Sequence, residues 1–437
     1  MRSREDVLEI LETALRHSRA DQTEVVVWNR ELQLTRFANS AIHQNLAESN
    51  TQVRVRVALG KRLGHAVTNR TEAAEVAQAV DRAIALARLV EPNKEFVSLP
   101  APAPLPEVRA FFAATAASEP ESRADVVARV AGIAQKGNCE AAGSLSVSVD
   151  VLGVGSSLGI RAYQPVTQAQ FTMIVTDSDA SGFAQAVSRD LSKLDCSAAA
   201  ETALRKCLDS RRPTNLTPGE YAVVLEPAAM GELILFLAYL GFGATVVQED
   251  RSFLCGRFGT QVMSEQVSIW DDGLDARGLP LAFDFEGMPK RRVDLIERGV
   301  ARGVVYDSYS AHKEKKTSTG HALPAPNTWG PIPTNLFMAT GTSSLREMIE
   351  GTERGVLVTR FHYVNPIHEK RTDVTGMTRD GTFLIEAGRI ARPLRNLRFT
   401  QSIVEALSGV DLLGSEAEVV GECTVPAVKL RRFRFSS

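Results

Sequence analysis

Three valines at alternate positions constrain the fold of this chain more than any other feature of its sequence. Val53, Val55 and Val57 alternate with polar residues in TQVRVRVALG, which predicts a strand with one buried face. The glycine and lysine that follow predict a turn into a returning strand. Because an alanine-rich amphipathic helix is predicted next, over 72–90, we expect an antiparallel sheet covered by helices.

The order helix, strands, helix occurs twice in the first half of the chain. The first unit has an opening amphipathic helix, then predicted strands at 24–28, 32–37, 53–57 and 63–67, then the helix at 72–90. A proline-rich connector at 91–107 separates it from the second unit, with a helix at 120–135, strands at 145–152, 159–165 and 171–176, and a helix at 197–208. This order suggests an internal duplication, although no residue-level repeat is visible.

The segment RRPTNLTPGEY, with two prolines and a glycine, predicts a domain boundary. We expect an N-terminal α+β domain at 1–214 and a β-rich C-terminal domain at 215–437, which makes the whole chain α+β. The second domain should open with a short strand at 221–225 and an apolar helix between Pro227 and Gly241. Short strands and turns follow, with one helix start marked by a capping box at Ser344.

The charges and cysteines argue against several classes of protein. The 437 residues include 50 basic and 52 acidic side chains, a net charge of −2, which gives no basic excess for nucleic-acid binding. Basic residues crowd 429–434, where a solvated terminal strand is the simpler interpretation. The five cysteines are odd in number and widely spaced, and the N-terminus is unlike a signal peptide, so we expect a cytoplasmic protein. The longest apolar run, 233–240, is too short to cross a membrane.

The seven histidines do not supply a zinc-protease motif. Such a motif needs two histidines on one helical face beside a glutamate. His368 is the only one followed by glutamate, and the positions four and five beyond it are not histidine. His362 and His368 lie six residues apart, but the pair Asn365–Pro366 between them should interrupt a regular strand. We therefore expect no metal site built from these histidines.

Two further features have a chemical and a structural interpretation. The segment 155–159 matches G-x-S-x-G, but that motif exposes a nucleophilic serine only on a strand-to-helix turn. More strand follows here, so a β-turn is the better prediction. Glu232 is a carboxylate inside the apolar helix, where an unpaired charge is costly. It could serve as a base, although a structural hydrogen-bond acceptor is the commoner role.

An ordered series of segments, more than any single motif, resembles a known family. The segments are LAFDFEGMPKRR (281–292), YDSYSAHKEKKTSTGHA (306–322), PTNLFMATGTSS (333–344), RGVLVT (354–359) and TRDGTFLIEAGRI (378–390). The first half agrees more loosely, in TRFANSAIHQ (35–44) and TQVRVRVALGKRLGHAVTN (51–69). Together they resemble the TldD/PmbA metalloprotease family, also called modulators of DNA gyrase, along nearly the whole chain.

In that family the TldD-type subunit carries H-E-x-x-x-H on a helix of the C-terminal domain, and a cysteine near the C-terminus completes the zinc site. The corresponding segment here is 230–236, in which Gly231 and Phe236 stand at the histidine positions and only Glu232 is retained. Cys423 lies in the right region but is offset from the family's cysteine by a few residues. The resemblance therefore implies a TldE (PmbA) type chain that does not bind zinc itself.

The resemblance further implies a two-subunit peptidase that cleaves unfolded or short peptides. A TldD-like HExxxH partner would supply zinc and the base, and this chain would close the substrate chamber. The alternatives are a stand-alone peptide-binding homodimer and a peptidase with unconventional catalytic residues.

A bound peptide could add as a strand to a groove in the second domain. The turns at 284–287 and 319–321 would line that groove, with substrate-binding candidates Glu286, Gly287, Thr319, Gly320 and His321. An equally weighted alternative is that these segments are tight turns that need glycine.

Overall fold

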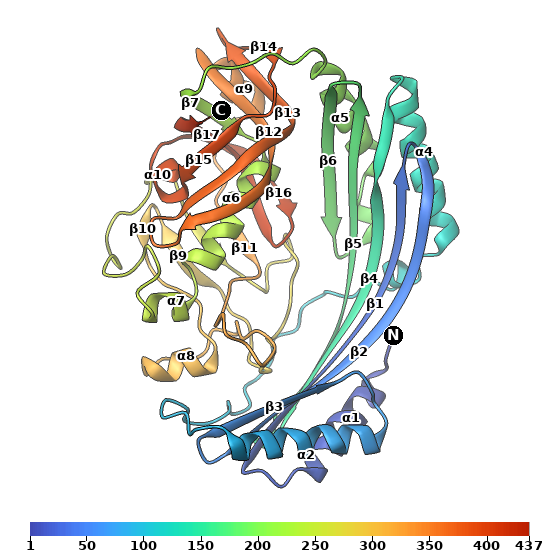
Figure 1. Cartoon of the computed structure of the whole chain (residues 1–437), viewed down its shortest axis with the longest axis vertical. Helices are drawn as coiled ribbons and strands as arrows, with labels where there is room; N and C mark the ends of the chain where they lie inside the picture. Colours follow the sequence, from blue (N-terminus) through green and yellow to red (C-terminus); the bar gives the residue numbers. More distant parts are fainter. Residues whose placement is uncertain (437) are drawn as a thin grey trace.

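The computed structural model describes residues 1–436 and contains two β-sheets, each packed with helices (Figure 1). The first half of the chain forms a six-stranded antiparallel sheet and the second half an eleven-stranded mixed sheet. This arrangement confirms the predicted α+β class. Within residues 1–436, every helix is too short or too polar to span a bilayer.

The N-terminal sheet has the strand order β3-β2-β1-β4-β5-β6. Its strands are β1 (Gln22–Ala38), β2 (Ala41–Leu59), β3 (Arg62–Thr68), β4 (Glu140–Ser156), β5 (Arg161–Asp177) and β6 (Ala180–Ser188). The separate strands predicted at 24–28 and 32–37 are wrong, because β1 runs through both. Polar Asn29 lies inside the strand, where its side chain donates to Thr51 Oγ1 (3.1 Å) and the ladder continues on both sides. Strand β5 (Arg161–Asp177) likewise joins most of the strand predicted at 159–165 to the one predicted at 171–176, because it pairs continuously with β4.

Four helices pack on one face of this sheet (Figure 1). They are α1 (Arg4–His17), α2 (Ala73–Leu89), α4 (Pro120–Lys136) and α5 (Cys196–Asp209), near the predicted ranges. The valines at 53, 55 and 57 point into the core beneath α1 and α2, as their alternation predicts. The opposite face of the sheet turns toward the C-terminal half of the molecule.

In each of the two helix–strand–helix units, a glycine in the last strand lies close to the backbone of the helix that follows. Each unit contributes three strands, and β1 and β4 pair at the centre of the sheet. A Cβ on Gly64 in β3 would lie 2.0 Å from the carbonyl oxygen of Ala83 in α2. A Cβ on Gly182 in β6 would lie 2.0 Å from the carbonyl oxygen of Ala203 in α5. This correspondence supports the proposed internal duplication, since both units need glycine at the same place.

The C-terminal sheet has the main order β10-β9-β8-β11-β17-β15-β13-β12-β7, with β14 on β13 and β16 on β17. Its strands are β7 (Gly219–Leu225), β8 (Ile269–Asp271), β9 (Val293–Glu297), β10 (Val300–Ala301), β11 (Leu336–Met338), β12 (Arg354–His368), β13 (Asp373–Glu386), β14 (Arg389–Pro393), β15 (Arg398–Ser402), β16 (Val410–Val420) and β17 (Cys423–Phe435). Because β17 also pairs with β7, the strands close on themselves around the main hydrophobic core.

Short helices accompany this sheet, and α6 is the longest of those described. They are α6 (Pro227–Leu240), α7 (Ala244–Gln248), α8 (Ser308–Lys313), α9 (Leu345–Glu350) and α10 (Ile403–Ser408). Helix α6 begins at Pro227 and ends before Gly241, as predicted, and packs on β12 and β17. The capping box at Ser344 is confirmed at the start of α9. Elsewhere, α3 (Ala113–Ala116) and a 3₁₀ turn (Leu191–Lys193) are short connections.

The prediction about Asn365–Pro366 is correct only in part. Strand β12 continues to His368, but its register against β13 shifts on both sides of this pair. Irregularities in the pairing on either side of the pair accommodate the proline, because a bulge removes the need for a ladder N–H.

Candidate functional site

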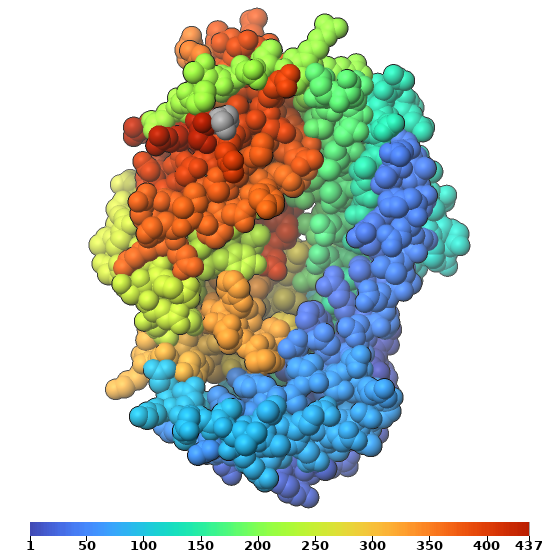
Figure 2. All heavy atoms as spheres, viewed as in Figure 1, coloured from blue at the N-terminus to red at the C-terminus, as the bar shows by residue number. Residues whose placement is uncertain are grey.

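A cavity of about 500 Å³ lies between the N-terminal sheet and the loops of the C-terminal half. One wall is the face of the N-terminal sheet opposite its helices, and the other comes from the segments 279–290 and 321–334. Figure 2 shows the surface hollowed between the orange C-terminal segments and the blue and green strands. Contacts such as Trp28 against Phe285, with ring centroids 5.6 Å apart, and Ser181 Oγ to Asp380 Oδ1 (2.7 Å) hold the two walls together.

The register of four strands builds the floor of this cavity. Each row of the floor takes one side chain from β2, β1, β4 and β5. The rows are Gln52–Trp28–Leu152–Gln164, Asn50–Arg30–Asp150–Val166 and Glu48–Leu32–Ser148–Gln168. The β4 and β5 members line the main cavity, while the β2 members line a smaller adjoining depression of about 160 Å³. Trp28 and Arg30 line both spaces, so the floor is continuous from the cavity to β2.

Two buried cations line the cavity. Arg189 donates to the backbone carbonyls of Leu279 (3.1 Å) and Pro280 (3.3 Å), and its Nε has no hydrogen-bond partner among residues 1–436. Burial lowers the pKa of Arg189 to about 10, so the group stays charged at neutral pH. Lys290 Nζ donates to Thr334 Oγ1 (2.8 Å). Glu422 is the acidic neighbour of Lys290, and burial raises the pKa of its carboxyl.

His321, predicted as a substrate-binding residue, lies buried in the cavity wall between Asp271 and Thr319. Its Nε2 lies 2.7 Å from Asp271 Oδ1, and its Nδ1 lies 2.9 Å from Thr319 Oγ1. Burial and the charge of Lys290 lower the pKa of His321, while Asp271 acts in the opposite direction. Burial would raise the pKa of Asp271, but His321 and Lys290 outweigh it and hold that pKa below its ordinary value.

The hydrogen-bonded side chains Asp271, His321 and Thr319 resemble a hydrolase triad, but their geometry indicates a structural role. Thr319 Oγ1 is buried and also accepts from the backbone N–H of Tyr306 (2.7 Å). Asp271 Oδ2 accepts from the backbone N–H groups of Thr334 (2.8 Å) and Asn335 (2.7 Å). A nucleophile must reach substrate, whereas this hydroxyl is enclosed by backbone. The three side chains therefore fix the positions of the surrounding loops.

The turn at 284–287 contacts both sheets. Asp284 accepts from the backbone N–H groups of Ala322 (2.8 Å), Glu286 (2.9 Å) and Met288 (2.9 Å). Gly287 has φ of +73°, and a Cβ there would lie 2.6 Å from Ile160 of the N-terminal half. Glycine is thus required by conformation and by the close approach of the two sheets.

Glu286 lies on the far side of this turn from His321. Its Oε1 accepts from Arg56 Nη2 of β2 (2.9 Å), and its Oε2 accepts from the backbone N–H of Ser308 (3.0 Å). It lines a second cavity of about 500 Å³ rather than the one that His321 lines. Gly320 has φ of +76° and its Cα packs against the backbone of Pro289. The structure therefore brings the two predicted turns into contact, and places Glu286 and His321 in different cavities.

The zinc-ligand positions implied by the family resemblance lie on α6 against the β16–β17 hairpin. A Cβ on Gly231 would lie 2.7 Å from Val420 Cγ1, so the space beside Gly231 is filled. Phe236 packs against the main hydrophobic core. Glu232 is half-buried, and burial raises the pKa of its carboxyl while Arg360 partly offsets this. Burial, together with Glu422, also raises the pKa of the Cys423 thiol.

These residues do not fit a zinc ion. Zinc requires deprotonated ligands, and burial raises the pKa of both Cys423 and Glu232, which disfavours their ionised forms. In the part of the chain that the structure describes, no group of three His, Cys, Asp or Glu side chains could hold a metal ion. A structural zinc site takes four ligands and a catalytic site three plus water. The described residues of α6 and β17 therefore do not assemble the three protein ligands that such a site needs.

The segment 155–159 forms the predicted β-turn rather than a nucleophile elbow. It connects β4 to β5, and Gly159 has φ of +106°. Ser157, the serine of the motif, accepts through its Oγ from the backbone N–H of Thr23 (3.0 Å), which is a structural role.

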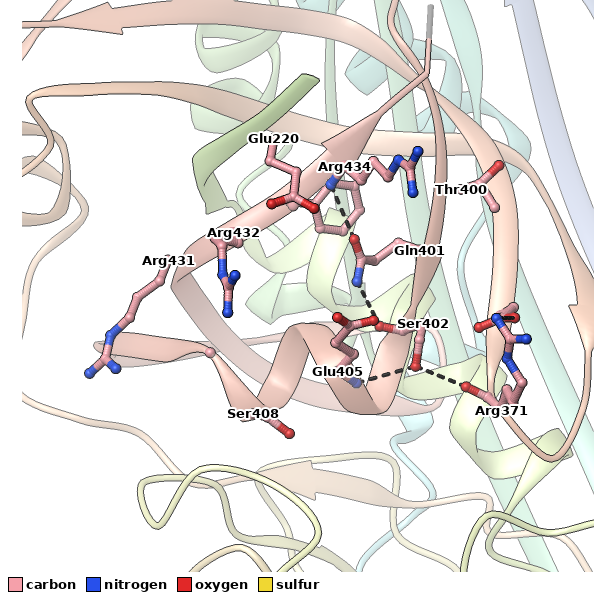
Figure 3. A pocket seen from close by; sticks show the side chains of 13 residues that line it. Glu220, Arg371, Thr400, Gln401, Ser402, Glu405, Ser408, Arg431, Arg432 and Arg434 are labelled. Atoms are coloured by element: carbon pink, nitrogen blue, oxygen red, sulfur yellow. Dashed lines mark hydrogen bonds and ion pairs between the residues drawn. The ribbon is translucent and has the colours of Figure 1, made fainter. Parts of the chain in front are cut away.

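A depression of about 370 Å³ borders the basic C-terminal strand (Figure 3). Its lining includes the arginines at 371, 431, 432 and 434 and the acidic residues at 220, 373 and 405. Arg371 pairs with Asp373 (2.8 Å), so the charge of this depression is mixed. The strand predicted over 429–434 is confirmed as part of β17, although Lys429 is buried and pairs with Asp411 (2.9 Å).

Two family models match the chain. The PmbA/TldA metallopeptidase C-terminal domain matches residues 218–437, and domain 1 of the PmbA/TldA metallopeptidases matches residues 23–87. The chain belongs to the PmbA/TldD family. This result confirms the resemblance drawn from the ordered segments.

Individual relatives agree with this family. The metalloprotease PmbA homolog of Haemophilus influenzae is 22% identical over 407 residues, which covers 87% of this chain and 85% of that protein. The metalloprotease TldD homolog of the same organism is 25% identical over 234 residues, which covers 51% of this chain and 47% of that protein. The chain spans less than half the length of the TldD homologs that it matches.

A solved structure has the same fold. TldE from Thermococcus kodakarensis superimposes with a TM-score of 0.90 at 22% identity, covering 99% of this chain and 100% of that one. At this identity the match establishes the shared fold.

Sequence reasoning missed the residues that form the cavity floor and its buried cations. Trp28 and Arg30 lie on β1, for which the sequence predicts two separate strands, at 24–28 and 32–37. Arg189 and Lys290 lie 101 positions apart and meet the same cavity only after folding. No local signal marks Arg189, which stands between Ser188 and Asp190 after the strand FAQAVS.

Proposed function

We propose that this chain is a TldE/PmbA-like subunit of a TldD/TldE-type metallopeptidase that cleaves unfolded or short peptides. The observation that carries the proposal is the packing of Val420 against Gly231, at the position where the family's zinc-binding subunit has histidine. A side chain long enough to bind metal has no room there. Catalysis would then depend on a TldD-like partner that carries the HExxxH motif and the zinc ion.

The chain's own contribution is to close and line the substrate chamber. The floor of the cavity offers amide, hydroxyl and apolar side chains from four strands, which suits peptides of varied sequence. The five cysteines are all unpaired thiols, in keeping with the proposed cytoplasmic location. Glu286 and His321 would act by fixing the loops around the chamber, since their polar atoms are engaged within the chain.

Co-expression with a TldD-like HExxxH subunit tests this proposal. We expect the two chains to co-purify and to hydrolyse an unfolded peptide such as reduced, denatured casein. Hydrolysis should be lost when the partner's HExxxH glutamate is replaced, and should be absent for either chain alone.

Two results would contradict the proposal. Hydrolysis by this chain alone would favour the alternative of a peptidase with unconventional residues. A stable homodimer that binds peptide but never associates with an HExxxH subunit would favour a stand-alone peptide-binding protein.

A further inference from the structure

Strand β2 is longer than its outer neighbour, so half of it borders open space. Residues 41–58 pair with β1 on one side, whereas β3 pairs only with residues 53–59 on the other. Among residues 1–436, no other strand pairs with the outer side of 41–52. Every residue from 41 to 50 is exposed.

The direction of the backbone groups along this edge follows from the ladder. The N–H of Ser157 in the β4–β5 turn donates to the carbonyl of Thr23 (2.8 Å), so odd-numbered residues of β1 direct their backbone groups toward β4. Even-numbered residues of β1 therefore face β2, and their partners on β2 are also even-numbered. The odd-numbered residues of β2 turn outward, which leaves the N–H and C=O groups at 45, 47 and 49 facing solvent.

This edge lacks the devices that usually protect a free strand. The segment QNLAESNTQ (44–52) contains no proline, lysine or arginine, and Glu48 is its single charged residue. Its pairing with β1 is regular, since the one irregularity lies nearer the hairpin tip. An unprotected row of backbone donors and acceptors is a template for another extended chain.

The exposed edge leads directly to the cavity floor. A strand added beside β2 would place alternate side chains next to Glu48, Asn50 and Gln52, which end the three rows of the floor. Trp28 and Arg30 then connect this depression to the main cavity. A peptide on the edge would therefore have its side chains at the rim of the chamber.

We propose that residues 45–51 of β2 bind an extended, unfolded peptide by strand addition. The proposal rests on the proposed function and assigns it a docking strand in the N-terminal sheet, rather than in the C-terminal turns at 284–287 and 319–321. Backbone hydrogen bonds would supply affinity with little dependence on sequence.

Proline at Ala47 tests the edge without removing a bond of the β1–β2 ladder, because the N–H of Ala47 faces outward. Ala47→Thr is the matched control, since it keeps the N–H and favours a strand. The probe is a fluorescein-labelled, unstructured ten-residue peptide of serine, threonine and alanine, measured by anisotropy with the whole chain and with the co-purified subunit present. A second probe carries N-methyl groups at alternate amides, which blocks one edge of the peptide.

We expect Ala47→Pro and the N-methylated peptide each to weaken binding about tenfold, the effect of losing one or two net hydrogen bonds. Ala47→Thr should bind as the original chain does, and circular dichroism should show all variants folded. Unchanged binding by Ala47→Pro would overturn the edge proposal and leave the proposed function intact. Absence of peptide binding by the original chain, with and without its partner, would overturn both.

Sedimentation of the same variants measures subunit association, and so distinguishes peptide binding at the β2 edge from binding of another subunit there. If Ala47→Pro changes the association of subunits but not the affinity for peptide, the edge binds a strand of another chain, and the peptide proposal is wrong.

Discussion

At the scale of single residues, the surroundings of Gly231 do not fit a metal ligand. Val420 fills the space in front of Gly231, while burial raises the pKa of the neighbouring Glu232 and Cys423. A histidine placed here would meet a packed hairpin rather than an open coordination site. The absence of ligands is thus built into the packing and does not depend on one substitution alone.

Replacing either of two helical glycines with alanine should change the free energy of unfolding, but in opposite directions. We expect Gly231→Ala to destabilise the fold by about 1–3 kcal/mol, because the new methyl would overlap Val420. Gly132→Ala in α4 meets no atom within 4 Å and should stabilise by about 0.5–1 kcal/mol. Urea unfolding of both variants measures this. Equal effects of the two substitutions would show that Val420 does not close the site.

The hydrogen-bonded side chains around His321 should contribute to stability rather than to chemistry. His321→Ala leaves the buried Asp271 carboxylate without one of its donors, so we expect a loss of about 3 kcal/mol. His312→Ala, at an exposed position on α8, should change stability little. Thermal unfolding compares the two. A folded His321→Ala protein of unchanged stability, but with impaired peptide hydrolysis in the complex, would contradict the structural role.

Asp284 should make the stability depend on pH. Burial and then Glu286 raise the pKa of Asp284 from 3.8 to about 7, although three backbone N–H groups act in the opposite direction. The folded chain therefore holds this proton more tightly than the unfolded chain does. Its stabilising contribution is complete below about pH 4 and is lost as the pH rises through about 7, at no more than about 1.4 kcal/mol per pH unit.

Asp284→Asn should remove this dependence. Urea unfolding between about pH 4 and pH 8 should show that the original chain loses stability relative to the variant as the pH rises. Asp125→Asn, at an exposed position, is the control and should follow the original chain. Parallel curves for the original chain and Asp284→Asn would contradict the raised pKa.

At the scale of elements, the sequence predicts those structures whose signals are local. The alternation at 53–57, the proline at the start of α6 and the capping box of α9 each depend on neighbouring residues, and each prediction is confirmed. The single long β1 could not be predicted in the same way, because Asn29 is satisfied by Thr51 on another strand. The cavity floor likewise depends on the register of four strands, which no local pattern encodes.

The repeated unit supports a test at this scale. Gly64→Ala and Gly182→Ala should each destabilise by about 2–4 kcal/mol, because both methyl groups would overlap a helix backbone at 2.0 Å. The two losses should be similar, since the β3–α2 and β6–α5 contacts are equivalent. Chemical unfolding measures both. A large loss in one variant and none in the other would contradict the equivalence of the units.

At the scale of the whole molecule, the N-terminal sheet and the loops of the C-terminal half form opposite walls of a chamber. The helices of the N-terminal sheet lie on its outer face, so its strand side chains line the interior. Arg56 and the turn at 284–287 join the walls at one end. On the proposed function, this shell would act with a second subunit that brings the metal.

Zinc content of the purified chain, measured by mass spectrometry after dialysis with and without added zinc, tests the central claim most directly. We predict a zinc content far below one ion per chain for this subunit alone, and about one ion per complex when a TldD-like HExxxH subunit is bound. One zinc ion held stoichiometrically by this chain alone would contradict the account.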